Sequence, residues 1–353
     1  MKLNLGTSGN YPYATARVRA KKAALLTKDN YPKLLMMDLH EIGRFLGETQ
    51  YNVEMTELAS RYEGVDLIEL GTSRNLARVY NDILGFTKGE LREMVASYLA
   101  RWDFWNIKTI LRGKLYGASV EDIREDLVPA GTLRAEDLDA LIALESVAEV
   151  LEAVKKHEGI EMPEEVMAEY HNSGRLSAIE DYLDKIYYVR LLKAIDVRSR
   201  PGKLLLAFIR KEIDMTNLTT LLKLKREKVA PDKIGTYLID GGDELTSREM
   251  QRLAATESFE ALISELSSFS FYEDIKEALE KAKETGSLND VSLAAKKHLM
   301  SRAERFSRLY PLSVLPIIDF MIRKKIEVDN IRIVARCKES GLDPETTKRL
   351  LVT

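Results

Sequence analysis

The sequence predicts an all-α protein made of three similar helical units of about 110 residues each. Most windows place apolar residues at i, i+3, i+4 and i+7, the spacing of one helix face, while the period-two alternation of strands is nearly absent. Proline and glycine are few and gather at the expected joints between helices. One long sequence phrase occurs three times, and this repeat divides the chain.

The repeated phrase is acidic-x-x-Asn-apolar-x-x-apolar-apolar-basic-x-Lys, and an apolar pair follows it at a constant distance from the Asn. The copies of the Asn are Asn106, Asn217 and Asn330, so the phrase recurs at nearly equal intervals. The apolar pairs are Leu127–Val128, Leu238–Ile239 and Leu351–Val352. We therefore expect helical domains at residues 1–128, which include an N-terminal extension, at 129–239 and at 240–353.

A second phrase predicts the start of a helix in each unit. It opens with an N-cap residue, Asp38, Ser146 or Ser258, and then places apolar residues one turn apart. The first two copies carry Glu at the third position after the cap, the pattern of a capping box. The cap precedes the repeated Asn by nearly the same length of chain in all three units, which supports a true repeat. The number and spacing of the repeats are compatible both with an open stack of units and with a closed pseudo-threefold ring.

The repeated helix has an apolar stripe, which is expected to build the core and is formed in the first copy by Ile107, Ile110, Leu111 and Leu115. Three lysines fall close to the stripe, at Lys114, Lys225 and Lys338. Three further basic residues point to the opposite side, at Arg112, Lys223 and Arg336. Each lysine either stabilises the C-terminal end of its own helix, with its stem along apolar surface, or belongs to a threefold set that binds an acidic partner. All six residues are candidate partner contacts.

Other residues of the repeat are expected to be structural. The Asn side chains are predicted to satisfy backbone groups where the preceding segment enters the helix. Trp102 and Trp105, one turn apart, are expected in the core, with a hot spot for a partner as the alternative. Cys337 aligns with Gly113 and Leu224, which indicates a packing position.

The sequence offers no catalytic, cofactor-binding or metal-binding constellation. There is no phosphate loop, no Gly-x-Gly-x-x-Gly, and no pair of histidines at metal-ligand spacing. The 53 basic and 56 acidic residues give a net charge of −3, which provides no whole-chain signal for nucleic-acid binding. A single cysteine excludes an internal disulfide, and the most apolar run, residues 309–322, is too short to span a bilayer. The basic stretch at residues 13–33 is either a solvated helix face or a contact for a partner or anionic lipid.

In the order and spacing of its phrases the chain resembles the C subunit of the archaeal and bacterial A/V-type ATP synthases, a family related to the d subunit of the eukaryotic V-type proton pump. The resemblance runs from about Tyr13 to the C-terminus. The matching segments are Leu39–Leu46 with Thr49–Tyr51, Asp103 with Asn106–Lys114, Tyr187–Tyr188 with Arg190–Leu192, and Asp329–Arg332.

The resemblance implies three similar helical domains around a pseudo-threefold axis, in the shape of a funnel. It implies a non-catalytic rotor subunit that links the central shaft to the membrane proteolipid ring and transmits torque. Such a subunit has no cofactor and binds no nucleic acid. It lies peripherally at the cytoplasmic face of the membrane, which it contacts indirectly through the ring. The alternatives are a generic α-helical adaptor with another protein partner, or an enzyme or nucleic-acid binder that uses the stretch Arg17–Lys33.

Overall fold

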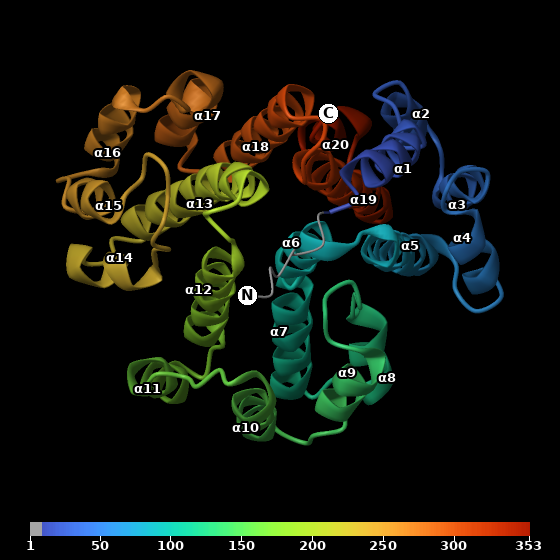
Figure 1. The fold of residues 1–353 in the computed structure, drawn as a ribbon, viewed down its shortest axis with the longest axis horizontal. Coiled ribbons are helices and arrows are strands. Elements are labelled where there is room, and N and C mark those ends of the chain that lie inside the picture. Colours follow the sequence, from blue (N-terminus) through green and yellow to red (C-terminus); the bar gives the residue numbers. More distant parts are fainter. Residues whose placement is uncertain (1–8) are drawn as a thin grey trace, which may run out of the picture. The chain divides into compact units, whose positions relative to one another are not determined.

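The computed structural model describes residues 9–353, which form helices and no β-strand (Figure 1). The prediction of an all-α chain is therefore confirmed. None of the helices formed by these residues is long and apolar enough to cross a membrane. The chain separates into two compact units, each described here by itself: unit one contains Phe45–Ala194, and unit two contains Asn10–Arg44 together with Ile195–Thr353.

Unit one is organised around α7 (Arg101–Tyr116). Its other helices are α4 (Asn52–Leu58), α5 (Gly64–Phe86), α6 (Gly89–Leu99), α8 (Val120–Asp126), α9 (Ala135–Ile142), α10 (Val147–Glu158), α11 (Glu164–Ser173) and α12 (Ser177–Ala194). Helix α3 (Leu39–Gly47) spans the boundary between the units. Helix α7 packs against α6, α8, α9, α10 and α12, so the repeated phrase of the first copy lies at the centre of this unit.

Unit two contains the other two copies of the repeated helix, in α13 (Arg200–Arg226) and α19 (Leu315–Glu339). Its other helices are α1 (Tyr11–Ala23), α2 (Asn30–Met36), α14 (Pro231–Tyr237), α15 (Ser247–Ala254), α16 (Phe259–Glu265), the short 3₁₀ turn η1 (Leu266–Ser268), α17 (Tyr272–Thr285), α18 (Asn289–Leu309) and α20 (Pro344–Arg349). Helix α13 packs against α14, α15, α16 and α18, while α19 packs against α1, α18 and α20. The two copies thus each have a shell of neighbouring helices. The division into three domains stays a prediction.

The apolar stripe of the repeated helix is buried in all three copies, as predicted, except for Leu115 of the first copy, which is only half-buried. Each of the other members is at most 1% exposed: Ile107, Ile110 and Leu111 in α7, Leu218, Leu221 and Leu222 in α13, and Ile331, Val334 and Ala335 in α19. Complete burial of a leucine or isoleucine side chain stabilises the folded state by about 1.5–3 kcal/mol. The stripe is therefore a main source of stability in each copy.

The repeated helices also end in the same way. The residue that closes each helix has a left-handed backbone, with φ of 69° at Gly117, 56° at Lys228 and 69° at Gly341. The next amide N–H then reaches back to a carbonyl in the last turn, from Ala118 to Gly113 (2.9 Å) and from Val229 to Leu224 (3.0 Å). The third copy repeats this bond at 2.8 Å, from Leu342 to Cys337. Two copies use glycine, which adopts this conformation without steric cost, whereas the second copy forces a lysine into it.

Replacing Lys228 with glycine is expected to raise the free energy of unfolding by about 1 kcal/mol, because the Cβ that crowds the left-handed backbone is removed. The change is measured as a shift in the urea midpoint of the purified chain. Lys228→Ala is the matched control, since it removes the same charge and keeps the Cβ. Equal stabilisation by both substitutions would show that charge, and not backbone conformation, is responsible.

The predicted N-caps are confirmed, and one of the two predicted capping boxes is wrong. Asp38 and Glu41 exchange side-chain to backbone bonds of 2.7 and 2.9 Å, so the box at α3 is present. At α10 the Ser146 hydroxyl accepts from the amide of Glu149, but the Glu149 carboxylate accepts from the amide of Glu145 at 2.9 Å. The carboxylate reaches one residue further back than a capping box requires.

Candidate functional site

Each repeated Asn forms a two-bond clamp with one later residue of the backbone. The Asn106 amide donates to the carbonyl of Val128 and accepts from the Val128 N–H, both at 2.9 Å. The same clamp joins Asn217 to Ile239 (2.8 and 2.8 Å) and Asn330 to Val352 (2.8 and 3.0 Å). The expectation that Asn serves the segment before the helix is wrong, since its partner lies in the segment after the helix. The clamp explains why the apolar pair keeps its distance from the Asn.

The acidic residue that opens the phrase holds the loop after the clamp. Asp103 accepts from the amides of Thr132 and Leu133 at 2.9 Å, and Asp214 accepts from the amides of residues 243, 244 and 245 at 3.0 Å. Burial raises the pKa of both carboxyls, although the N–H donors act in the opposite direction. A Cβ at Gly131 would lie 2.0 Å from Asp103 Oδ1, and one at Gly242 would lie 2.4 Å from Asp214 Oδ1. Glycine is therefore needed in both loops.

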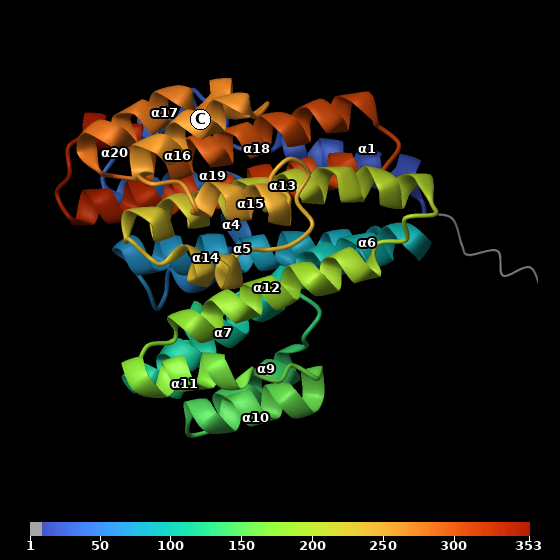
Figure 2. The same ribbon diagram turned by 90° about the vertical axis from the view of Figure 1, so that its left-hand side faces the viewer.

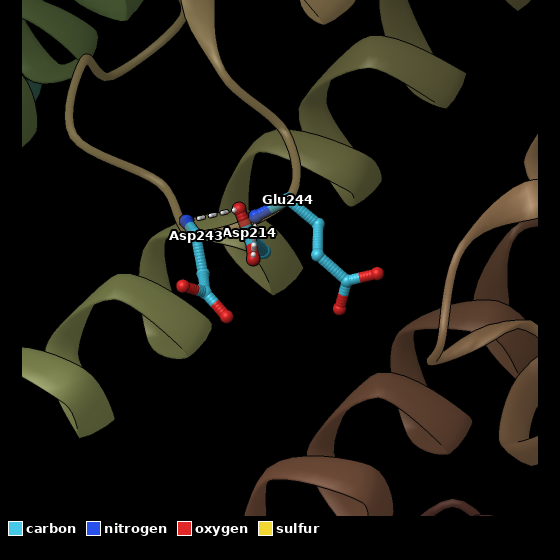
Figure 3. Close-up of side chains that lie close together, drawn as sticks. All are labelled: Asp214, Asp243 and Glu244. Carbon is cyan, nitrogen blue, oxygen red and sulfur yellow. Dashed lines mark hydrogen bonds between the residues drawn. The ribbon is translucent and has the colours of Figure 1, made fainter.

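Three carboxylates gather around Asp214, as Figure 3 shows. One oxygen each from Asp214, Asp243 and Glu244 lies within 4.8 Å of the others. These groups already have partners within the chain. Asp243 forms an ion pair of 2.8 Å with Lys211, and Glu244 accepts from the amide and hydroxyl of Ser270 at 2.8 and 2.5 Å. The cluster holds the loop at residues 243–245 against α13, and we do not assign it as a metal site.

The three lysines near the stripe bind the carbonyl ends of short helices. Lys114 Nζ donates to the carbonyl of Ile142, the last residue of α9, at 2.5 Å. Lys225 Nζ donates to the carbonyls of Ala254, the last residue of α15 (2.9 Å), and Thr256. An ammonium group here satisfies carbonyls left free at the end of a helix and opposes the negative end of its dipole. Burial lowers the pKa of Lys225.

The third copy makes the same contacts with the N-terminal part of the chain. Lys338 Nζ donates to the carbonyl of Leu35 in α2 at 2.7 Å, and the Glu327 carboxylate accepts from the amide of Leu26. Helix α2 thus has the position that α9 and α15 have in the other copies, and it packs against α20 as α9 packs against α8. The segment Asn10–Arg44 completes the third copy, in agreement with its place in unit two.

The three basic residues on the opposite side of the helix, Arg112, Lys223 and Arg336, are exposed. Arg112 is also engaged within unit one, where its guanidinium binds both oxygens of Glu180 on α12 at 2.6 and 2.8 Å. The structure therefore gives an intrachain partner to Arg112 and to each of Lys114, Lys225 and Lys338. A contact of any of the six residues with another protein stays a prediction.

Only one of the two tryptophans expected in the core is buried. Trp102 is buried as expected, but Trp105 is 41% exposed, because it lies on the side of α7 away from the stripe.

Arg101 lies 3.7 Å above the ring of Tyr98 and donates to the hydroxyl of Tyr187 at 2.8 Å. Nothing in the spacing of these residues points to this cluster. A cavity of about 150 Å³ opens beside it, lined among others by Asp103, Phe104, Ile107, Tyr187 and Arg190.

His298 on α18 gives a pH-dependent contribution to stability. The ring is buried, with Nδ1 2.6 Å from the Asp274 carboxylate, while Arg302 and Lys211 add positive charge nearby. Burial lowers the pKa of His298 below its usual value near 6.5, and the carboxylate offsets this only in part. The unfolded chain then binds the proton more readily than the folded chain, so stability falls as pH drops through and below 6.5.

Between about pH 7.5 and 5.5 we expect the free energy of unfolding to fall less in His298→Gln than in the parent chain, because glutamine does not titrate. The difference is up to about 1.4 kcal/mol for each pH unit by which folding lowers the pKa of His298. Melting temperatures measured across that pH range give the comparison. His171→Gln, at an exposed position on α11, is the control and should follow the parent chain. Parallel pH profiles of the parent and His298→Gln would contradict the assignment.

Comparison with known proteins identifies the family. The sequence profile of the ATP synthase (C/AC39) subunit family matches residues 14–350. The chain belongs to the ATP synthase C/AC39 subunit family. It is 38% identical to the A-type ATP synthase C subunit of Methanococcoides burtonii over 348 residues, 98% of this chain and 95% of the relative.

Two further relatives agree. The chain is 40% identical to the A-type ATP synthase C subunit of Methanosarcina acetivorans (99% and 95% covered) and 35% identical to that of Haloferax volcanii (98% and 99% covered). This member of the C/AC39 family is thus a subunit of a rotary ATP synthase. The side chain of Cys337 is buried within this chain, as expected for a packing position.

Proposed function

We propose that this chain is the non-catalytic rotor subunit that links the central shaft of an A/V-type ATP synthase to the membrane proteolipid ring. The observation that carries the proposal is the near full-length match, at 34–40% identity, to C subunits of A-type ATP synthases. Under this proposal the chain lies at the cytoplasmic face of the membrane and contacts it through the ring. It transmits torque for ion-coupled ATP synthesis or hydrolysis, and its three repeats surround a pseudo-threefold axis as a funnel.

The internal anchors support a mechanical role. A part that transmits torque must resist deformation when its two neighbours turn against it. The Asn clamp, the buried acidic residue and the lysine tie the repeated helix of each copy to the short segments around it. Buried hydrogen bonds with both partners satisfied are costly to break, so each copy is expected to move as a rigid body.

Co-purification tests the proposal. A tagged copy of the chain is expected to bring down the proteolipid ring and the shaft subunits when the complex is extracted gently from its own membranes. An untagged strain gives the background. Recovery of a different, constant partner without ATP synthase subunits would instead favour an adaptor of another complex.

The three lysines give a second test. We expect Lys114→Gln, Lys225→Gln and Lys338→Gln, combined in one chain, to lower the melting temperature, because each ammonium binds backbone carbonyls of a short helix. Coupling of ATP hydrolysis to ion transport is then measured in the reconstituted complex at a temperature where the variant stays folded. Reduced coupling there would assign the lysines a partner contact, and unchanged coupling would limit them to the fold.

A further inference from the structure

One end of unit two carries large apolar side chains in solvent beside several arginines. The end of α18 and the turn after it expose Leu309 (59%) and Leu312 (64%), and the start of α1 exposes Tyr13 (53%). Exposed cationic side chains lie on the same two helices and at the start of α13. We name this set the basic end surface, and it consists of Tyr13, Arg17, Arg200, Lys203, Arg305, Arg308, Leu309 and Leu312.

Two contacts bring the parts of this surface together. The Thr15 hydroxyl on α1 donates to the carbonyl of Pro311 at 3.1 Å, so the start of α1 lies against the turn after α18. The ring centroids of Phe208 on α13 and Phe306 on α18 are 6.3 Å apart, which joins the early part of α13 to the end of α18. Figure 2 shows the starts of α1 and α13 and the end of α18 at the same edge of unit two.

The turn that carries Leu312 is held in one conformation. The Ser313 hydroxyl donates to the carbonyl of Tyr310 at 2.7 Å and accepts from the amide of Leu315 at 3.2 Å. Ser313 and Val314 are buried, while Pro311 and Leu312 are exposed. Leu312 is therefore presented to solvent by a fixed turn, and binding it would cost little additional ordering of the chain.

The charge of the basic end surface is strongly positive. Its exposed cations are Arg17, Arg200, Lys203, Arg305 and Arg308. Two carboxylates on or beside the same elements are paired with arginines: Glu304 with Arg308 and Arg323, and Asp196 with Arg198 next to the start of α13. The chain as a whole is slightly acidic, so this concentration of positive charge is local. It would attract an acidic surface and orient it before contact.

We propose that the basic end surface binds an acidic, partly apolar surface of another subunit of the same ATP synthase. The inference rests on the proposed function, which requires a tightly held neighbour. Arginine and tyrosine are enriched in protein interfaces, and all the cations of the surface except Lys203 are arginines. Leu309 and Leu312 form the apolar centre, and the cations form the rim that sets partner choice and association rate.

Cross-linking in the assembled complex tests the inference. A photo-reactive amino acid replaces Leu312, and the complex is purified and irradiated. The expected product is a covalent adduct with one other subunit of the ATP synthase. Absence of an adduct in a complex that retains the chain, or an adduct with lipid only, would overturn the inference and leave the proposed function intact. Absence of the chain from the ATP synthase even without substitution would overturn both.

Charge reversal gives an independent measurement. Arg305→Glu with Arg308→Glu is expected to reduce retention of the chain in the complex at least about tenfold, and raised salt is expected to weaken retention of the parent chain. The matched control is Lys276→Glu with Lys281→Glu on α17, which makes the same change in net charge at exposed positions. Melting temperatures of both variants show that they are folded. Equal retention of the two double variants would contradict the inference.

Discussion

Asn106→Ala is expected to lower the free energy of unfolding by about 2–4 kcal/mol, because it removes the Asn amide that pairs with both the N–H and the carbonyl of Val128. Val128 is 4% exposed and Asn106 is completely buried, so water does not readily replace the lost partner. Each unsatisfied buried group costs about 1–3 kcal/mol. The loss is measured from urea unfolding of the purified chain, followed by circular dichroism.

Asn172→Ala is the matched control for this variant. Asn172 lies exposed on α11, so its substitution should change stability by no more than about 0.5 kcal/mol. Asn217→Ala and Asn330→Ala should resemble Asn106→Ala, since their clamps have the same geometry. A loss below about 1 kcal/mol in all three would mean that the clamps are incidental to the repeat.

Glu327→Ala is expected to be the most damaging single substitution in unit two, with a loss of about 3–5 kcal/mol. Lys324 is completely buried and its ammonium lies 3.1 Å from the Glu327 carboxylate, which is 2% exposed. Removing the carboxylate leaves a buried cation without this counter-charge, which is far more costly than the pair itself is worth. It also frees the amide of Leu26, so the segment leading into α2 loses an anchor.

The double variant Lys324→Met with Glu327→Gln separates these two effects. It removes the buried charge and keeps an oxygen that can accept from the Leu26 amide, so it should recover most of the stability lost in Glu327→Ala. Glu280→Ala breaks the exposed i,i+3 pair with Lys283 and should cost less than about 1 kcal/mol. A double variant as unstable as Glu327→Ala would show that the charge pair itself holds the unit together.

The helical class and the repeat could be predicted from the sequence because both depend on local spacing. The apolar residues of the stripe recur at helical spacing, and the apolar pair follows each Asn at a constant distance. Both regularities can be read directly from the sequence. The direction of the Asn bonds was predicted wrongly, because spacing shows that two positions are linked and does not show which atoms meet. The lysines were expected to act on the C-terminal end of their own helix, whereas Lys114 binds the end of a neighbouring helix, α9.

The role of α2 in completing the third copy could not be predicted. The contacts that do this join residues roughly 300 positions apart, such as Lys338 with Leu35 and Lys22 with Asp319 (2.6 Å). Local pattern therefore shows residues 13–33 only as a basic helix face. The exposed Trp105 was missed for a related reason: an aromatic residue one turn from a buried Trp102 can lie on either side of the stripe, and only the packing of neighbouring helices decides.

The joining of the N-terminal segment to α19 and α20 has a consequence for the order in which the protein is made. During synthesis the segment Asn10–Arg44 leaves the ribosome long before residues 311–338, with which it makes hydrogen bonds and an ion pair. In unit one the Asn106 and Asp103 side chains bind backbone groups within about 30 residues, so this part can fold early. Unit two can fold completely only after residues 311–338 have been made. Until then Tyr31, Leu34 and Leu35, all buried in the finished protein, stay exposed on the nascent chain. Molecules cut short before α19 would keep them exposed permanently, which makes such fragments natural substrates for chaperones and proteases.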